Sequence, residues 1–356
     1  MQVKDLLKRL SEAEGASGYE AAVRDLVRQE FAQYVDEIRT DSMGNLIALK
    51  RGQVAEQSPR RSIMLAGHMD EIGLLVTKLE KGFIRFSTIG GFDLRVLPGQ
   101  EVTVHGRTDL PGVIGMRPPH VLEKAARDKV VPLDELFVDV GLAESELGSH
   151  VRVGDIITLQ RPFAELANDL VSGKAFDNRA ALVCIAGCLE HLTAMRHTWD
   201  VHAVATVQEE VGLKGALTSA FGIGPDVGIA LDVTHGNMPG VSEVDTVKIG
   251  EGPAIGFGPN IHPLMFSRLV QAANTFEIVH QTEPIPTHSG TDAWAIQVTR
   301  AGIPTAVVSI PLRYMHTTVE TLALTDLRRT SRLLAVFIAN LDEKFAQQLG
   351  LEQLNA

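Results

Sequence analysis

The chain has 356 residues, with 44 Asp and Glu against 33 Lys and Arg, and therefore a formal net charge of −11. A hydrophobic share of 45% and a charged share of 22% are typical of a globular protein with a sizeable core, and they exclude a collagen, a disordered chain and a disulfide scaffold. The length favours two domains, and the acidic balance argues against nucleic acid or an anionic membrane as partner, because both attract basic surfaces.

The N-terminal stretch carries charges throughout and lacks the apolar segment of a signal peptide, so we expect no secretory signal there. It instead predicts an amphipathic helix with Leu6, Leu7 and Leu10 on one face, ending near Gly15. Nowhere does an uncharged apolar stretch reach the roughly 18 residues of a membrane-spanning helix. The sequence therefore predicts a protein that is neither secreted nor inserted in a membrane.

The next part of the chain predicts strands, first in an α/β setting and then in an all-β setting. Residues 36–50 form a strand pair with a turn at Gly44-Asn45, and residues 62–67 are an apolar strand. From residue 74 to residue 162, short strand-like runs are separated by Gly, Pro and Asp, which predicts a small all-β domain, a barrel. Only residues 121–128 have a helical period there.

After Pro162, helices and strands alternate again. The pattern predicts helices over 179–195 and 264–280 and strands over 202–208, 227–233 and 305–312. A last helix is predicted from Thr325, as its N-cap, to about Gly350. Such alternation is typical of a mixed or parallel sheet covered by helices on both faces.

The fold class predicted is therefore α/β, a mixed sheet covered by helices, with an inserted small all-β barrel. The α/β domain is discontinuous and takes residues 1–73 and 163–356, and the insertion takes residues 74–162. The two cysteines, Cys184 and Cys188, lie four apart in an apolar helical pattern, which favours buried small side chains. Free thiols indicate a reducing, cytoplasmic compartment.

Five short stretches place His, Asp or Glu at the end of an apolar strand or beside a glycine. They are GHMDEIG with His68 and Asp70, KAFDNRAA with Asp177, VQEEVGLKGA with Glu209 and Glu210, VGIALDVTHG with Asp232, and IPLRYMHTTVE with His316. Each has a plainer interpretation alone, such as a helix N-cap for Asp177. From these residues, two His, two Asp and two Glu can act as ligands from strand ends of one domain, a set that suits zinc, cobalt or manganese better than calcium.

These stretches, with GVIGMRPPH, closely resemble the motifs of the M42 family of metallo-aminopeptidases, which includes the tetrahedral aminopeptidases and bacterial glutamyl aminopeptidases. The resemblance runs in order from about residue 5 to residue 345. It implies two divalent metal ions per subunit, zinc or cobalt with manganese as a third choice. It also implies that Asp177 bridges the metals, that His68 and Asp232 complete one site, and that Glu210 and His316 complete the other.

The same resemblance implies a mechanism and an assembly. Glu209 would be the general base, which must stay off the metals to accept a proton, and Asp70 would orient His68. The substrates would be short peptides with a free N-terminus. The inserted domain, residues 74–162, would mediate dimerisation, and the loop after GVIGMRPPH would reach toward a neighbouring active site. Dimers would assemble into a hollow tetrahedral dodecamer.

Other functions remain open from the sequence. The same dinuclear site could act on an N-acyl amino acid or another amide, or the chain could be a catalytically silent cage protein. A glycosidase is least favoured, because its paired carboxylates act without metals. His288, in THSGTDAW, is either an active-site contact or a surface residue. The preferred N-terminal residue of the substrate is not predicted.

Overall fold

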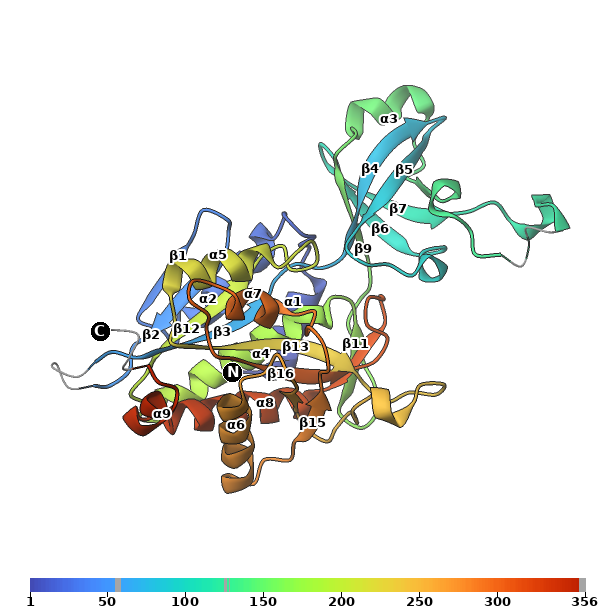
Figure 1. Cartoon of the computed structure of the whole chain (residues 1–356). Helices are drawn as coiled ribbons and strands as arrows, with labels where there is room; N and C mark the ends of the chain where they lie inside the picture. The colour runs from blue at the N-terminus through green and yellow to red at the C-terminus, as the bar shows by residue number, and fades with distance from the viewer. Residues whose placement is uncertain (55–58, 125–126, 128, 352–356) are drawn as a thin grey trace.

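The computed structural model describes residues 1–54, 59–124, 127 and 129–351. A large α/β part carries a smaller β barrel that projects from one end of it (Figure 1). The large part is built on an eight-stranded sheet with the order β1-β2-β12-β3-β13-β16-β14-β15. Its strands are β1 (Glu37–Thr40), β2 (Leu46–Lys50), β3 (Ser62–His68), β12 (Asp200–Thr206), β13 (Val227–His235), β14 (Ala254–Phe257), β15 (Gln281–Pro284) and β16 (Thr305–Leu312).

The centre of this sheet is parallel. Strands β12, β3, β13 and β16 run in the same direction, and antiparallel pairs flank them on both sides. Strand β3 reads as an apolar run, SIMLAGH, because both of its faces are covered. Alternate residues point to opposite faces: Ile63 and Leu65 enter one core, whereas Met64 and Ala66 enter another.

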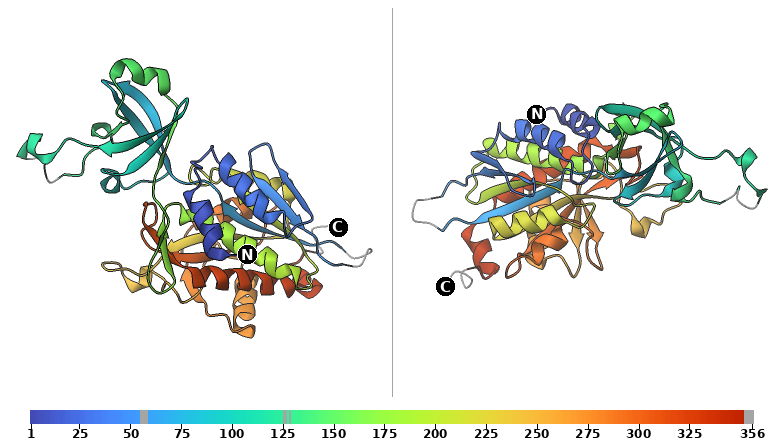
Figure 2. Two further views of the ribbon diagram at one scale, coloured as in Figure 1. Left: turned by 180° about the vertical axis from the view of Figure 1, so that it is seen from behind. Right: turned by 90° about the horizontal axis from the view of Figure 1, so that it is seen from above.

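Helices cover both faces of the sheet. The larger core receives side chains from α1, α2, α4, α6, α8 and α9, and α5 and α7 cover the opposite face. Seen from behind in Figure 2, the blue N-terminal helices, the green α4 and the red α8 lie side by side over the sheet. The helices are α1 (Val3–Glu12), α2 (Ala21–Phe31), α4 (Phe176–Thr193), α5 (Lys214–Ile223), α6 (Pro263–Thr275), α7 (Asp292–Gln297), α8 (Leu324–Ala339) and α9 (Glu343–Gln348).

The barrel is closed and antiparallel, with the order β4-β5-β8-β7-β6-β9, and it has its own apolar core. It contains β4 (Gly73–Glu80), β5 (Phe83–Ile89), β6 (Glu101–His105), β7 (Asp109–Gly115), β8 (Phe137–Asp139), the helix α3 (Glu144–His150) and β9 (Ile156–Leu159). A third, three-stranded sheet, β10-β11-β17, follows the barrel. Its strands are β10 (Ala164–Glu165), β11 (Leu170–Gly173) and β17 (Glu320–Ala323).

The predicted fold class, α/β with a mixed sheet and an inserted barrel, is confirmed. The prediction of one last helix is wrong in two respects. Helix α8 begins at Leu324 with Ala323 as its N-cap, so Thr325 lies inside the first turn. The chain then leaves the helix after Ala339, and Asp342 begins α9 by accepting a hydrogen bond from the backbone N–H of Phe345.

The structure also bears on the predicted helices, the two cysteines and the expected absence of a membrane span. Helix α3 was not predicted, and part of the helical pattern over 121–128 lies outside the described residues. Cys184 and Cys188 are free and buried, and burial raises the pKa of both thiols. Within the described part of the chain, no helix is long and apolar enough to cross a membrane.

Candidate metal centre

The candidate residues converge at the carboxyl end of the parallel strands, the edge at which α/β sheets present ligand sites. His68 ends β3, and Thr206, its neighbour across the parallel pair, ends β12 just before Glu209 and Glu210. Asp232 lies in β13, the next strand on the other side of β3. The sheet therefore brings together residues that are far apart in the sequence.

Asp177 lies at the middle of the cluster, in the first turn of α4. Its Oδ1 is 3.2 Å from Nε2 of His68, and its Oδ2 is 3.3 Å from Nε2 of His316. The same His316 nitrogen is 3.3 Å from Oε1 of Glu210. Asp177 is 7% exposed and has non-helical backbone angles. Each carboxylate oxygen therefore faces a different imidazole.

The donor atoms form three groups in which all atoms lie within 4.8 Å of one another: His68–Asp177–Asp232, Asp177–Glu210–His316, and His68–Glu209–Glu210. Two ligands about 2.1 Å from one cation lie about 3.4 Å apart at a tetrahedral angle. The separations of 3.2 and 3.3 Å around Asp177 match that spacing. The residues present therefore fit two divalent cations of the zinc type.

The tautomer of His68 also fits a cation site. Its Nδ1 lies 3.0 Å from the backbone carbonyl oxygen of Asp70. A carbonyl oxygen can only accept, so Nδ1 carries the hydrogen and donates it. In the neutral form of His68 that would bind a cation, Nε2 carries the lone pair on the side of Asp177, the arrangement in which a ligating imidazole is held by its second nitrogen.

The carboxylate of Asp70 is fully buried and organises the neighbouring pair of glutamates. Its Oδ1 accepts from the backbone N–H of Glu209 at 3.1 Å, and its Oδ2 accepts from the backbone N–H of Glu210 at 3.2 Å. The hydroxyl of Ser17 donates to the same Oδ2 at 2.6 Å. Asp70 Oδ1 is 3.6 Å from Nδ1 of His68. Asp70 thus fixes the backbone from which Glu209 and Glu210 project.

Without a bound cation, the electrostatics of the cluster are unfavourable. Burial raises the pKa of Glu209 to about 10, against the opposing charge of His68. Burial likewise raises the pKa of Asp232 well above its usual range and raises the pKa of Glu210. The pKa of Asp177 is lowered, because hydrogen bonds from the two histidines outweigh its burial. So many buried carboxylates are unfavourable without nearby positive charge, which divalent cations would provide.

Glu320 was not predicted, although it lies within the stretch RYMHTTVE. It is 2% exposed, and its Oε1 accepts from the backbone N–H of His316 at 3.0 Å. Its Oε2 accepts from the backbone N–H of Asp177 at 3.1 Å. One carboxylate thus fixes the backbone at two candidate ligands. The only signal in the sequence was its position four residues after His316.

A buried ion cluster beneath the site was also missed. Lys174 Nζ donates to both oxygens of Glu71 at 2.8 and 2.7 Å. Arg179, fully buried, donates to the carbonyl oxygens of Met69 at 2.6 Å and Leu10 at 2.5 Å, and also to Glu71. The cluster joins the end of β3 to the start of α4 and the end of α1. Its members lie within a few residues of His68 or Asp177, but their partners could not be read from the motifs.

His288 lies outside the three donor groups. Its ring is exposed and packs edge-on against Trp294, with ring centroids 5.5 Å apart. The structure therefore does not bring this residue into the donor cluster.

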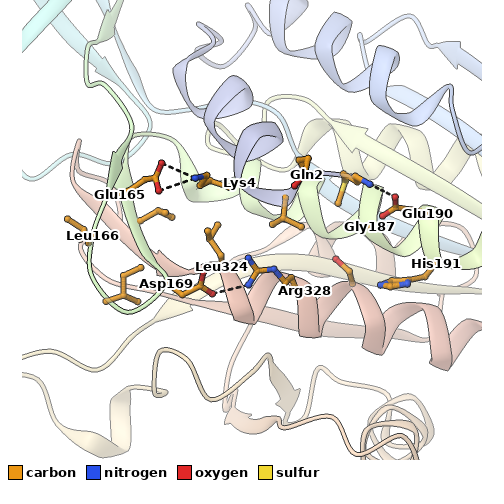
Figure 3. Close-up of a pocket in the computed structure, with 15 residues that line it drawn as sticks. Gln2, Lys4, Glu165, Leu166, Asp169, Gly187, Glu190, His191, Leu324 and Arg328 are labelled. Carbon is orange, nitrogen blue, oxygen red and sulfur yellow. Dashed lines mark hydrogen bonds and ion pairs between the residues drawn. The ribbon is translucent and has the colours of Figure 1, made fainter.

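A cavity of about 580 Å³ lies at the far end of α4, near Glu190, where α1, β10, β11 and α8 meet (Figure 3). The rise of the helix separates Glu190, which lines the cavity, from Asp177 by about 20 Å. Lys4 pairs with Glu165 at 3.0 Å, and Arg328 pairs with Asp169 at 2.9 Å. Among the described residues, no group of metal-binding side chains lies in this cavity. The candidate site is therefore the strand-end cluster.

Comparison with known proteins confirms the family indicated by the motifs. Residues 44–333 match the family described as M42 glutamyl aminopeptidase. A lysyl aminopeptidase of Pyrococcus furiosus is 35% identical over 95% of this chain and 97% of its own length. The structure of an aminopeptidase from the archaeon Desulfurococcus kamchatkensis is 39% identical, covers 98% of this chain and 97% of that one, and has a TM-score of 0.90.

A third relative bears on assembly. The structure of the TET1 peptidase of Pyrococcus horikoshii, which can assemble into a tetrahedron or a large octahedral shell, is 30% identical with a TM-score of 0.84. The match covers 96% of this chain and 100% of that one. The similarity therefore spans both the α/β part and the barrel.

Proposed function

The chain belongs to the M42 glutamyl aminopeptidase family and is a peptidase hydrolase, and on this basis we propose that it removes N-terminal residues from short peptides at a site for two divalent cations. One observation carries the proposal: the two oxygens of Asp177 face the imidazoles of His68 and His316 at 3.2 and 3.3 Å. A carboxylate between two imidazoles is the arrangement expected of a bridging ligand.

The donor groups suggest how the ligands divide. Asp177 would bridge the cations, His68 and Asp232 would complete one position, and Glu210 and His316 would complete the other. Neutral imidazole and carboxylate ligands favour zinc or cobalt, and manganese is a third choice. The proposed acidic ligands are counted in the formal net charge of −11, and bound dications would offset part of that charge.

When bound, two such cations polarise the scissile carbonyl and lower the pKa of water. The chain supplies the proton transfer. Glu209, which is 9% exposed, has its Oε2 3.8 Å from Nε2 of His68, beside the ligands. In the proposal this carboxylate takes a proton from the attacking water and returns it to the leaving amine. The carboxylate of Asp70 accepts a hydrogen bond from the backbone N–H of Glu209 and so holds Glu209 in position.

We base the proposed assembly on a relative of known structure and the proposed location on the buried free thiols. We propose that the inserted barrel, residues 74–162, mediates dimerisation and that dimers build a hollow shell like that of the TET1 peptidase. Enclosure would exclude folded proteins and admit short peptides. Buried free thiols favour a cytoplasmic location.

The proposal is tested with a panel of aminoacyl-p-nitroanilides and short peptides, using apoprotein reloaded with Zn²⁺, Co²⁺ or Mn²⁺. We expect release of N-terminal residues from free peptides and no release when the amine is acetylated. Hydrolysis of N-acyl amino acids alone would instead indicate an amidase. Failure to hydrolyse any of these substrates would indicate a cage protein without catalysis.

A further inference from the structure

The barrel begins shortly after β3, the strand that ends in the candidate ligand His68. His68 ends β3, and Gly73, five residues later, begins β4 of the barrel. Strand β5 pairs antiparallel with β4 so that Ile89 lies opposite Gly73. The end of β5 therefore returns to the same place, and the base of the first barrel hairpin lies beside the candidate site.

Two glycines at this base lie close to candidate ligands. A Cβ added to Gly90 would lie 3.2 Å from Oε2 of Glu210, and a Cβ added to Gly91 would lie 3.3 Å from Nδ1 of His316. The segment that follows is anchored in the barrel, because Leu97 is fully buried in the barrel core. The backbone of the barrel thus lies near two ligand side chains, and even a Cβ at either glycine would make a tight contact with one of them.

A hydrogen bond makes a second connection. The hydroxyl of Thr318, two residues after His316, donates to Oε1 of Gln100 at 3.0 Å. Thr318 is 6% exposed, and Gln100 immediately precedes β6 of the barrel. The amide of Gln100 also donates to the backbone carbonyl of Val96 at 2.8 Å, which fixes its orientation. The loop that carries His316 is therefore tied to the barrel.

The two cation positions differ in how the fold supports them. His68 and Asp232 belong to adjacent strands of the large sheet, where His68 pairs with Thr206 of β12 and Asp232 pairs with Ser309 of β16. Glu210 and His316 lie in loops after β12 and β16, and His316 has a positive φ of 60°. Asp70 and Glu320 hold the backbone N–H groups of these two loop residues. The barrel approaches their side chains at Gly90 and Gly91, and Gln100 holds Thr318 in the loop that carries His316.

We propose that the barrel is part of the metal site, and that its contacts set the cation affinity of the Glu210–His316 position while leaving the His68–Asp232 position unaffected. Gly91 and Thr318 are positioning residues in this scheme, acting through His316. The inference rests on the proposed function, because it assumes two cation positions that share Asp177.

The test is a stepwise titration of apoprotein with Zn²⁺, followed by calorimetry and by competition with a chelator. Gly91→Val places a side chain against His316, and Thr318→Val removes the hydroxyl that reaches Gln100. We expect each substitution to lower the Zn²⁺ affinity of the Glu210–His316 position by about tenfold or more and to leave the other binding step unchanged. Such a loss is usual when the groups that hold a metal ligand are disturbed. His316→Ala and Asp232→Asn identify which step belongs to which position.

Two controls separate positioning from general damage. Gly148→Val changes a barrel glycine whose added Cβ would meet nothing within 4 Å, so both binding steps should stay as in the wild type. Thr318→Ser keeps the hydroxyl and should restore the affected step. Because Thr318→Val differs little in shape from the wild type, it keeps the test valid if Gly91→Val fails to fold.

Wild-type affinities at both positions in Gly91→Val and Thr318→Val would overturn the inference, as would equal weakening of both steps. Either result leaves the proposed function intact, because the wild type still binds two cations. A wild type that binds fewer than two cations would instead overturn the proposed function, and the inference with it.

Discussion

Glu209 and Glu210 are consecutive residues with different proposed roles, and their carboxylates lie beside different imidazoles. Glu210 Oε1 lies 3.3 Å from His316, within a donor group around Asp177. Glu209 Oε2 lies 3.8 Å from Nε2 of His68, and the donor atoms of His68, Glu209 and Glu210 all lie within 4.8 Å of one another. Because adjacent side chains diverge, one backbone turn anchored by Asp70 can offer both a ligand and a base.

At this scale we predict that Glu209→Gln abolishes most of the hydrolysis but keeps cation binding. The amide has nearly the shape of the carboxylate and cannot accept the proton, so kcat should fall by about 10²- to 10⁴-fold. Steady-state kinetics on an aminoacyl-p-nitroanilide measures the loss, and metal analysis after dialysis measures the cation content. A Glu209→Gln variant with kcat within a few-fold of the wild type would remove Glu209 from the mechanism.

The residues of the donor cluster could be predicted because their chemistry is carried by the side chain and by a local motif. His68 and Asp177 are examples. Glu320 and Arg179 could not be, since they act on backbone groups elsewhere in the fold. Glu320 reaches the N–H of Asp177 across 143 residues, and Arg179 reaches the carbonyl of Met69 across 110. Hydrogen bonds of that range depend on topology, which a motif does not encode.

At the scale of elements, the position of α4 against α8 is fixed by a close approach. A Cβ added to Gly187 would lie 2.5 Å from Oγ and 2.9 Å from Cβ of Ser331 in α8. Helix α4 carries Asp177 at its first turn, so any displacement of α4 would move the proposed bridging ligand. The small residue allows the two helices to pack closely.

We predict that Gly187→Val forces these helices apart and lowers the free energy of unfolding by about 1–3 kcal/mol, the usual cost of overpacking. Gly222→Ala is the matched control, because a Cβ at Gly222 in α5 would meet nothing within 4 Å. It should instead raise stability by about 0.5–1 kcal/mol through helix propensity. Urea denaturation of both variants checks the prediction, and equal stabilities would contradict it.

Helices and strands with a clear pattern of apolar residues could be predicted from the sequence, whereas elements with few apolar residues could not. The strands β3, β13 and β16 were correctly placed because each is an apolar run buried on both faces. Helix α3 has one buried residue, Leu147, and so leaves no periodic pattern to detect. The break between α8 and α9 was missed because Asp342, a good N-cap, lies inside a continuous apolar period.

At the scale of the whole molecule, the fold concentrates buried carboxylates at one strand edge, so cations should stabilise the folded chain. Ligand binding to the folded state at 100 times the dissociation constant adds about 2.7 kcal/mol. We predict that a chelator lowers the melting temperature and that Zn²⁺ restores it. Sodium chloride at equal ionic strength is the control and should not restore it. An unchanged melting temperature after complete removal of metal would contradict this prediction.

The presence of a β barrel beside the mixed sheet was predictable from the run of short strand-like segments, but the contact between barrel and sheet was not. Gly90 and Gly91 read as a turn at the end of a barrel strand. Their approach to Glu210 and His316 depends on how the hairpin folds back onto the large sheet. Local sequence gives no information on that geometry.

A crystal structure of the metal-loaded protein would show whether Asp177 lies between two cations, as we propose. Anomalous difference maps at the zinc edge should show two peaks per subunit, both next to Asp177. One peak should lie between His68 and Asp232, and the other between Glu210 and His316. A single peak, or two peaks that do not share Asp177, would contradict the account.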